Sequence, residues 1–459
     1  MDVNKKILEM KEEIIQSLKE CIKIRSVENR GEGGTPFGLG IQEALNYCLN
    51  LSEDFGFKTV NLDDKIGYAE YGKGDEMVAV LGHLDVVPEG KGWKYPPYEG
   101  EIHDGKMYGR GTTDDKGPTI GALYALKIIK DLNIPIKKRV RVIFGLNEET
   151  SSECVKHYIE KKEELPVAGF TPDAEYPIIN GEKGIVTCEY KKNLNQDEKI
   201  ILKSIKGGTA PNVVPEYADA EILVLDAETD NIIDMSKEIK EIEIDKISDN
   251  MILVKSYGIS AHGSTPEIGK NAISHLLLFL QKLNFNKDVK EFVNFMNKYI
   301  GTDTTGESMD IYLEDDISGK FVLNLGKIQG NEKEISISIN MRYPVTKNYE
   351  DFNFIFREKM KLGDFKEVYT KHKKSLYVSP QSELIKKLQK VYEEQMGEKA
   401  DLISIGGGTY AKSMPNIVAF GPIFKGEPMV EHKPNEYIDI NGLLKNIEIM
   451  VCAICELAN

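Results

Sequence analysis

The sequence lacks any apolar run close to the length of a membrane span. The longest candidate, around residues 447–458, is interrupted by Glu448 and Glu456, whereas a spanning helix needs roughly 20 predominantly apolar residues. Residues 1–20 are dense in Lys and Glu, which is typical of an amphipathic helix and not of a signal peptide. We therefore expect a cytoplasmic protein with no membrane partner.

An excess of positive charge is also missing. The chain has 59 Lys and Arg against 74 Asp and Glu, which gives a formal net charge of −15. A field of this sign repels phosphate groups, so we expect no nucleic-acid partner. The surplus of acids leaves room for a cluster of carboxylates in a metal site.

Cysteine is scarce and scattered. Among the six cysteines, only Cys452 and Cys455 form a C-x-x-C pair, which could indicate redox or metal chemistry. The sequence has no second C-x-x-C to complete a tetrahedral zinc site. The pair also lies in a terminal helical pattern of apolar residues, so we interpret both thiols as small core residues.

The length of 459 residues predicts roughly two or three domains. Up to about residue 180, apolar runs without alternation (77–81 and 140–146) are separated by helical patterns at 4–24, at 39–55 and after Gly117. This arrangement indicates a buried, mostly parallel sheet that helices cover on both faces. The same alternation of helical patterns and apolar runs returns from about residue 380, with a helix at 383–395, a strand at 402–405 and a helix from Asn441.

The intervening segment has a different texture. Residues 185–190, 200–205, 218–225 and 335–343 alternate between apolar and polar, as half-exposed strands do. Helical patterns interleave near 231–242, 271–283 and 349–362. We therefore predict one α/β domain, residues 1–180 and 380–459, interrupted by an inserted α+β domain at 181–379.

Acids and histidines cluster where the apolar strands of the α/β domain end. His83 and Asp85 follow one strand, Glu148 and Glu149 follow another, and Asp173 follows a third short segment. In sheets of this kind ligands gather at the carboxyl ends of the strands. Acids there are costly unless cations or water compensate them, and carboxylates with neutral imidazoles suit zinc, cobalt or manganese.

Each cluster alone has an ordinary explanation. His83 could be a structural histidine, Glu148 and Glu149 could begin a solvated helix, and Asp114 with Asp115 could cap the helix that follows them. Together with Asp114 and Asp115, the three groups that follow strands make four clusters of acids or histidines in one domain. Four such clusters favour a metal site over these explanations.

Three blocks carry a resemblance to a known family: G-H-L-D-V-V-P at 82–88, Y-G-R-G-T-T-D-D-K-G at 108–117 and N-E-E at 147–149. They resemble the signature blocks of the co-catalytic metallopeptidases, which include aminoacylase, carboxypeptidase G and the peptidase V type dipeptidases. The blocks S-A-H-G-S at 260–264 and E-H-K-P-N-E at 431–436 extend the resemblance over nearly the whole chain. Within the family, A-P-N-V-V-P at 210–215, N-M-R-Y-P at 340–344 and G-G-G-T-Y-A at 406–411 are typical of the peptidase V branch.

The resemblance implies a zinc-exopeptidase-like catalytic domain with a ferredoxin-like lid, and two divalent metal ions. Zinc is the expected metal, with manganese or cobalt as alternatives. Asp114 would bridge the two ions. The predicted ligands of the first ion are His83 and Asp173, and those of the second are Glu149 and His432.

Further roles follow from the resemblance and from the chemistry of peptide hydrolysis. Asp85 would orient His83, and Glu148 would be the general base that takes a proton from the attacking water. His262 in the inserted domain could complete an oxyanion hole on lid closure, although a surface loop histidine is the alternative. The predicted substrate-binding residues are Asn212, Arg342, Gly407, Gly408 and Thr409.

One position departs from the family pattern. Many relatives have Met after the bridging aspartate, whereas this chain has Asp115. By alignment the bridge is assigned to Asp114. Asp173 is the variant expected in the dipeptidase and aminopeptidase branches, because acylases and carboxypeptidases usually have Glu there.

Two other function classes fit the sequence less well. Residues 406–413 nearly match the phosphate loop G-x-x-x-x-G-K-[ST], but Ala411 replaces the required glycine. A non-catalytic binding protein on the same fold would be expected to lose the base or a ligand, and every position is filled. We predict a metal-dependent dipeptidase acting on dipeptides or short peptides with a free N-terminus, as a monomer or homodimer. The alternatives are an N-acyl amino acid deacylase or a short-peptide aminopeptidase.

Overall fold

The computed structural model describes residues 2–196, 200–225, 229–237 and 239–459. The chain divides into two compact units. Unit 1 comprises Met1–Asn180, Val378–Ile403 and Gly408–Asn459, and unit 2 comprises Gly181–Tyr377 and Ser404–Gly407. Residues 404–407 therefore cluster with the inserted segment, although we predicted them in the α/β domain at 1–180 and 380–459. The roles expected for the two parts, catalytic domain and lid, stay predictions.

A nine-stranded mixed sheet organises unit 1. Its order is β1 (Lys58–Leu62), β2 (Ile66–Tyr71), β6 (Arg139–Gly145), β3 (Met77–His83), β7 (Ala168–Thr171), β22 (Ile417–Ala419), β9 (Ile178–Glu182) and β20 (Leu376–Tyr377), with β21 (Leu402–Ile405) also paired to β9. The residues of β20 belong to unit 2 and pair with Gly181 and Glu182, the end of β9 that unit 2 also contains. The central pairs β6–β3, β3–β7 and β7–β22 are parallel, and β1–β2 and β2–β6 are antiparallel. All seven residues of β3 are buried, as an apolar run without alternation predicts.

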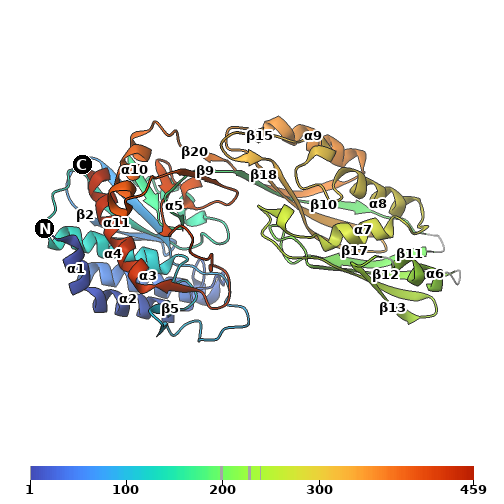
Figure 1. Ribbon diagram of the computed structural model, residues 1–459, viewed down its shortest axis with the longest axis horizontal. Helices are drawn as coiled ribbons and strands as arrows, with labels where there is room; N and C mark the ends of the chain where they lie inside the picture. The colour runs from blue at the N-terminus through green and yellow to red at the C-terminus, as the bar shows by residue number, and fades with distance from the viewer. Residues whose placement is uncertain (1, 197–199, 226–228, 238) are drawn as a thin grey trace. The chain divides into compact units, whose positions relative to one another are not determined.

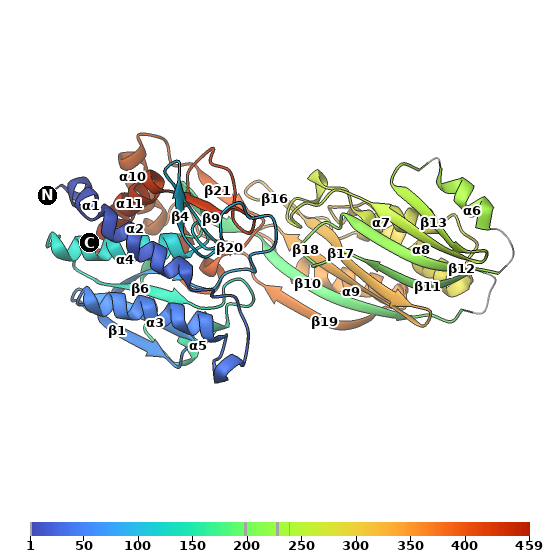
Figure 2. The ribbon, with the colours of Figure 1, turned by 90° about the horizontal axis from the view of Figure 1, so that it is seen from below.

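Seven α-helices of unit 1 pack on this sheet and on one another (Figures 1 and 2). They are α1 (Val3–Glu9), α2 (Lys11–Lys23), α3 (Leu39–Asp54), α4 (Lys116–Asp131), α5 (Glu153–Glu160), α10 (Glu383–Met396) and α11 (Ile440–Ala458). Helix α4 packs against α2, α11, β3 and β6, which buries 13 of its 16 residues. Even Lys116 is buried, because its Nζ donates to the carbonyls of Cys21 and Ile24 at 3.0 and 2.6 Å.

Smaller elements of unit 1 surround the sheet. A three-stranded sheet joins β4 (Glu101–His103), β5 (Lys106–Tyr108) and β24 (Tyr437–Asp439), and a two-stranded sheet joins β8 (Ala174–Glu175) and β23 (Pro422–Ile423). Two 3₁₀ turns, η1 (Glu32–Gly34) and η4 (Tyr410–Lys412), complete the unit. The pairing of β24 with β5 brings two distant segments of the chain together.

Unit 2 is built on an eight-stranded antiparallel sheet. Its order is β13 (Ile242–Ser248), β14 (Met251–Tyr257), β12 (Tyr217–Val224), β11 (Ile200–Gly207), β17 (Val322–Asn331), β18 (Glu334–Tyr343), β10 (Gly184–Asn193) and β19 (Lys366–Lys373). The remaining elements are α6 (Thr229–Ser236), α7 (Ala272–Leu280), α8 (Lys287–Tyr299), α9 (Glu350–Leu362), β15 (Glu314–Asp315), β16 (Gly319–Lys320), η2 (Pro266–Ile268) and η3 (Glu307–Met309). The sheet is thus longer than the four strands of a simple ferredoxin-like domain.

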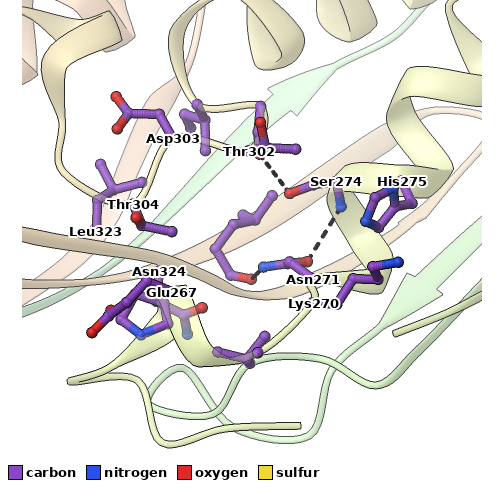
Figure 3. A pocket seen from close by; sticks show the side chains of 16 residues that line it. Glu267, Lys270, Asn271, Ser274, His275, Thr302, Asp303, Thr304, Leu323 and Asn324 are labelled. Atoms are coloured by element: carbon purple, nitrogen blue, oxygen red, sulfur yellow. Dashed lines mark hydrogen bonds between the residues drawn. The ribbon is translucent and has the colours of Figure 1, made fainter. Parts of the chain in front are cut away.

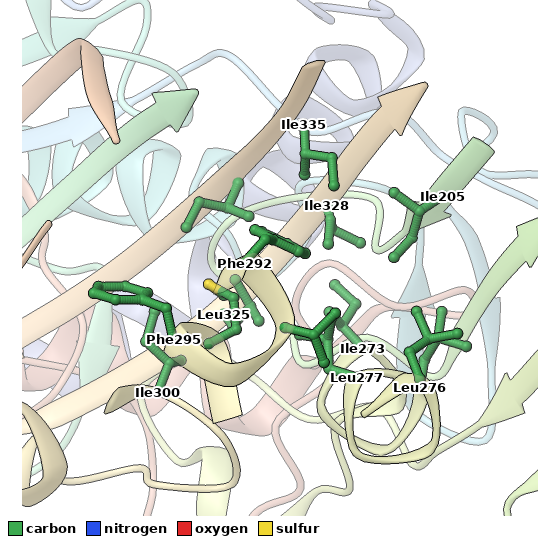
Figure 4. Packing of buried hydrophobic residues seen from close by; sticks show 14 of the residues in the cluster. Ile205, Ile273, Leu276, Leu277, Phe292, Phe295, Ile300, Leu325, Ile328 and Ile335 are labelled. Atoms are coloured by element: carbon green, nitrogen blue, oxygen red, sulfur yellow. The ribbon is translucent and has the colours of Figure 1, made fainter. Parts of the chain in front are cut away.

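One face of this sheet carries the core of unit 2. Strand β10 alternates between buried and half-buried residues along its length, which is the pattern of a sheet with one covered face. Ile273 and Leu277 of α7 and Phe292 of α8 pack with Leu325 and Ile328 of β17 (Figure 4). The α+β layering expected for the inserted segment is confirmed.

Two sequence-based element predictions need correction. The single helix expected at 4–24 is two helices, since Met10 leaves helical geometry at φ −96° and ψ 2°. The helix expected near 231–242 ends at Ser236, and Ile242 begins β13 because it pairs with Ser256 of β14. Residue 238 of that prediction lies outside the described residues. Helix α8 was not predicted.

Candidate metal centre

The acidic and histidine clusters of unit 1 meet at one edge of its sheet. Strands β6, β3 and β7 are parallel neighbours, so their carboxyl ends lie together. His83 is the last residue of β3 and pairs with Gly145 of β6. Glu148 and Glu149 follow the end of β6 by three and four residues, and Asp173 follows β7 by two residues.

Asp114 stands between two histidines. Its Oδ1 lies 2.9 Å from His83 Nε2, and its Oδ2 lies 2.9 Å from His432 Nε2. His83 Nε2 also lies 3.8 Å from an oxygen of Asp173, and His432 Nε2 lies 3.0 Å from Glu149 Oε1. One carboxylate that faces two imidazoles with different oxygens is the geometry that a bridging ligand requires.

Two overlapping groups of three side chains could each hold a cation. His83, Asp114 and Glu149 form one group, and His83, Glu148 and Asp173 form the other, with ligand atoms within 4.8 Å of one another. Glu148 thus belongs to the cluster by position. Its role as general base and not ligand rests on the resemblance and stays a prediction.

Asp85 holds both the histidine and the glutamates in place. Its carboxylate accepts the backbone N–H groups of Glu148 and Glu149, each at 3.1 Å. The Nδ1 of His83 lies 2.9 Å from the Asp85 carbonyl oxygen and 3.5 Å from its carboxylate. From the sequence we predicted only the contact of Asp85 with His83. The two hydrogen bonds from Asp85 to the loop after β6 were not predicted.

The carboxylate of Asp115 binds the backbone of His83 and the side chain of Thr119. Its Oδ2 accepts the backbone N–H of His83 at 3.0 Å and the hydroxyl of Thr119 at 3.2 Å. Gly82 leaves space for this carboxylate, because a Cβ there would lie 2.7 Å from Asp115 Oδ2 and 2.0 Å from Thr119 Oγ1. Of the two adjacent aspartates, Asp114 is therefore the one with the bridging position.

The surrounding carboxylates raise the pKa of both histidines. Burial opposes protonation of His83, but its carboxylate partners, Asp114 first, raise the pKa of this imidazole well above its ordinary value. Partial desolvation opposes protonation of His432, whose side chain is half-exposed, and Asp114 with Glu149 raises its pKa to about 11. Burial and the charge of Asp114 raise the pKa of Glu149 to about 7, and burial raises that of Asp173 to about 7 as well.

The residues fit a pair of divalent cations. Buried His83 Nε2 lies 2.9 Å from Asp114 Oδ1 without a well-aligned hydrogen bond to it, and this placement suits a nitrogen that shares a cation with the carboxylate. The donors are carboxylate oxygens and imidazole nitrogens, the set that zinc, cobalt and manganese accept. A cation would compete with the proton for each imidazole nitrogen, since a metal ligand must be deprotonated.

The predicted substrate residues fall in both units. Asn212, Arg342 and Gly407 belong to unit 2, as does His262, the predicted oxyanion residue, whereas Gly408 and Thr409 belong to unit 1. The structure brings Asn212 and His262 close together, because the Gly263 N–H donates to the Asn212 carbonyl at 2.7 Å. Thr409 is buried and its hydroxyl accepts the backbone N–H of Ala411 at 3.1 Å.

Arg342 is buried, contrary to the exposed position that a strand arginine often takes. Its side chain is 3% exposed and donates to the side-chain oxygen of Asn340 and to the carbonyl of Gly406. Burial lowers the pKa of the guanidinium to about 10. A role in binding a substrate carboxylate stays a prediction.

Unit 2 has a cavity of about 230 Å³ beside the first turn of α7 (Figure 3). Polar side chains on its wall make bonds within the fold: Asn271 donates to the Leu325 carbonyl at 2.9 Å, and Ser274 to the Gly301 carbonyl at 2.5 Å. Asn324 donates to the carbonyls of Pro211 and Val213 at 2.9 and 3.0 Å. The wall of this cavity therefore anchors the turn that carries Asn212.

Residues 406–413 do not form a phosphate loop. Strand β21 is followed by Thr409, which caps the three-residue turn η4, whereas a phosphate loop leads into a full helix whose N-terminus binds the anion. The nucleotide-hydrolysing alternative is therefore wrong. In the part of the chain that the structure describes, no helix combines the length and apolar character of a membrane span.

Several residues that shape the site were not predicted. Tyr410 packs edge-on to His83 with ring centroids 6.1 Å apart, and its hydroxyl lies 2.9 Å from Cys154 Sγ. Gly145 allows this packing, since a Cβ there would lie 2.3 Å from the tyrosine ring. Glu436, in the E-H-K-P-N-E block, was quoted for its resemblance but given no role.

Comparisons with known proteins agree with this geometry. A model of the peptidase family M20/M25/M40 matches residues 79–456. A Bacillus subtilis (strain 168) protein named "Putative dipeptidase YtjP" is 42% identical over 464 residues, covering 98% of each chain. A Staphylococcus epidermidis protein with the same kind of name is 36% identical over 460 residues, again covering 98% of each.

Solved structures share the fold at low identity. Human carnosine dipeptidase 1 superposes with a TM-score of 0.60 at 15% identity, covering 99% of this chain and 98% of that one. The dipeptidase Dug1p from Saccharomyces cerevisiae gives a TM-score of 0.59 at 15% identity, covering 99% and 98%. At these identities the likeness concerns the fold alone.

Proposed function

The chain belongs to the peptidase family M20/M25/M40, and on that basis we propose that it is a metal-dependent dipeptidase. Its substrates are dipeptides or short peptides with a free N-terminus. The observation that carries the proposal is Asp114, whose two oxygens each lie 2.9 Å from a different histidine. The dipeptidase names of the full-length relatives support the substrate class.

The proposed metal centre uses five side chains of unit 1. His83 and Asp173 hold one cation, Glu149 and His432 hold the other, and Asp114 is shared. When bound, two divalent cations supply Lewis acidity toward the scissile carbonyl and lower the pKa of the attacking water. Zinc is the proposed metal, with manganese or cobalt as alternatives.

The protein's own residues have distinct tasks in this proposal. Glu148 takes the proton of the attacking water and delivers it to the leaving amine, as a general base that then acts as an acid. Asp85 keeps Glu148 in position through its backbone N–H. His262 stabilises the oxyanion, and Asn212, Arg342, Gly407, Gly408 and Thr409 bind the peptide.

The second candidate is hydrolysis of N-acyl amino acids on the same scaffold, and a third is a short-peptide aminopeptidase. Asp173, where acylases of the resembled family usually have Glu, favours the dipeptidase. We further propose that the protein is cytoplasmic and that it works as a monomer or homodimer.

One experiment separates these activities. The metal-depleted protein is assayed on dipeptides, tripeptides and N-acyl amino acids, with zinc, manganese and cobalt restored one at a time. Dipeptides are expected to be the best substrates. Faster hydrolysis of N-acyl amino acids would replace the proposal with the deacylase, and equal rates on longer peptides would replace it with the aminopeptidase.

A further inference from the structure

Glu436 is a fully buried carboxylate close to two predicted metal ligands. Its side chain is 0% exposed, and it lies four residues after His432 in the sequence. Its Oε1 accepts three backbone N–H groups, from Gly111 at 3.0 Å, Thr113 at 2.9 Å and Asp114 at 3.2 Å. One carboxylate oxygen thus gathers the loop that presents Asp114.

The other oxygen of Glu436 binds a buried arginine. Arg110 Nη1 donates to Glu436 Oε2 at 2.6 Å, and the two side chains are 2% and 0% exposed. The guanidinium also lies over the ring of Trp93, 5.4 Å from its centroid. Because a buried charge is tolerated only when it is paired and hydrogen-bonded, the carboxylate and the guanidinium depend on each other.

Main-chain bonds join the same two segments. The Gly109 N–H donates to the Glu436 carbonyl at 2.9 Å, and the Thr113 hydroxyl donates to the Tyr437 carbonyl at 2.6 Å. Strand β24 then continues the contact by pairing with β5. The segment after His432 and the loop before α4 therefore form one connected unit, although more than 300 residues separate them.

His432 is exposed and has a strained backbone. Its side chain is 53% exposed, and its backbone lies in the left-handed region at φ +61°, which costs a non-glycine residue energy unless its surroundings hold it there. Downstream, Asn435 accepts the Lys94 N–H at 2.5 Å, and Glu436 follows at once. The bonds of Asn435 and Glu436 therefore anchor the chain shortly after His432.

We propose that Glu436 is a positioning residue that fixes Asp114 and His432 relative to each other and thereby sets the affinity of one metal position. This inference rests on the proposed function, because it takes Asp114, Glu149 and His432 as ligands of one cation. The other position depends on His83 and Asp173, which Glu436 does not touch. Glu436 therefore acts on the two positions unequally.

The test is a titration of the metal-depleted protein with Co²⁺ alone, against a competing chelator, followed by the visible absorption of the bound cobalt. The wild type is expected to bind two equivalents. Glu436→Gln keeps the shape but removes the charge that Arg110 needs. It is expected to weaken one equivalent by about 10- to 100-fold, the usual effect of a partner that orients ligands, and to change its spectrum.

A matched control is the pair of Glu70 and Arg141, with Nε to Oε2 at 2.6 Å and side-chain exposures of 10% and 7%. Both residues lie in unit 1, on β2 and β6, outside the metal cluster. Glu70→Gln is expected to lower the thermal midpoint while both cobalt equivalents keep their affinity and spectrum. A purely structural effect of Glu436 would resemble this control.

Glu436→Asp guards against a variant that fails to fold. It keeps the charge, so it is expected to fold and to bind the weakened equivalent with an affinity between those of the wild type and Glu436→Gln. Two unchanged equivalents in the folded variants would overturn the inference. Failure of the wild type to bind two equivalents would instead overturn the metal centre of the proposed function. If the wild type binds two equivalents of cobalt but does not hydrolyse peptides, the proposed function is wrong and the inference on Glu436 stands.

Discussion

At the scale of single residues, two adjacent glutamates are proposed to do different work. Asp85 binds the backbone N–H groups of both Glu148 and Glu149, so their positions are fixed together while their side chains stay free to differ in role. Glu149 reaches His432 at 3.0 Å. The difference between base and ligand can therefore be tested by changing one side chain at a time.

Glu148→Gln is expected to lower turnover by about 100-fold or more, because the group that takes the proton from water is lost. The bound metal content, measured by elemental analysis, is expected to stay at the wild-type value. Glu149→Ala serves as the comparison and is expected to lose metal. Equal metal loss in both variants would show that the two roles are wrongly assigned.

His262 offers a second test at this scale. It is exposed in unit 2, so His262→Ala is expected to leave the thermal midpoint almost unchanged. If the imidazole stabilises the oxyanion, turnover on a dipeptide is expected to fall by about 10² to 10³-fold, with metal content unaffected. Turnover within twofold of the wild type would remove His262 from the mechanism.

At the scale of elements, the sequence could predict the strands that end at the site. Buried parallel strands consist of apolar residues without alternation, so β3 and β6 were recognisable, as were the acids after them. The signal for α8 was present too, since Val289, Phe292 and Met296 are buried at helical spacing, but it was not used.

Contacts between distant segments could not be predicted from local patterns. The salt bridge of Arg110 with Glu436 joins residues 326 positions apart, and the edge contact of Tyr410 with His83 requires Gly145 to lack a side chain. Local spacing carries no information about such pairs. The break at Met10 was hidden for another reason, because methionine is itself a good helix former.

The turn after β15 gives a prediction on pH. Asp315 accepts the backbone N–H groups of Ile317, Ser318 and Thr346, and despite partial burial these bonds lower its pKa to about 2 from 3.8. A carboxyl with a depressed folded-state pKa stabilises the fold above its unfolded pKa, and this contribution is lost as the pH falls.

Asp315→Asn is expected to lower the free energy of unfolding by about 1 to 2 kcal/mol at pH 7. The difference from the wild type is expected to shrink as the pH falls from about 5 toward about 2. Urea unfolding at several pH values measures it. Asp316→Asn, at the next acid in the same turn, is the control, and a difference that stays constant over this range would contradict the prediction.

At the scale of the whole molecule, the proposed ligands and the proposed substrate residues are distributed differently between the two units. All five proposed ligands, His83, Asp114, Glu149, Asp173 and His432, lie in unit 1, whereas unit 2 contains none of them and holds the proposed oxyanion residue His262 and several proposed substrate residues. A cation that binds the native protein and not the unfolded chain stabilises the native state by mass action. Its effect on stability is therefore expected to fall on unit 1.

Removal of the metals tests this distribution together with the activity. Chelation is expected to abolish dipeptide hydrolysis, and a restored divalent transition metal is expected to recover it. In calorimetry, metal at about 100 times its dissociation constant is expected to stabilise the transition of unit 1 by about 2.7 kcal/mol per site. The stability of unit 2, measured by hydrogen exchange of the amides of β11 and β12, is expected not to change. Full activity in a sample shown by elemental analysis to be metal-free would refute the metal centre, and equal stabilisation of both units would show that unit 2 also takes part in holding the metals.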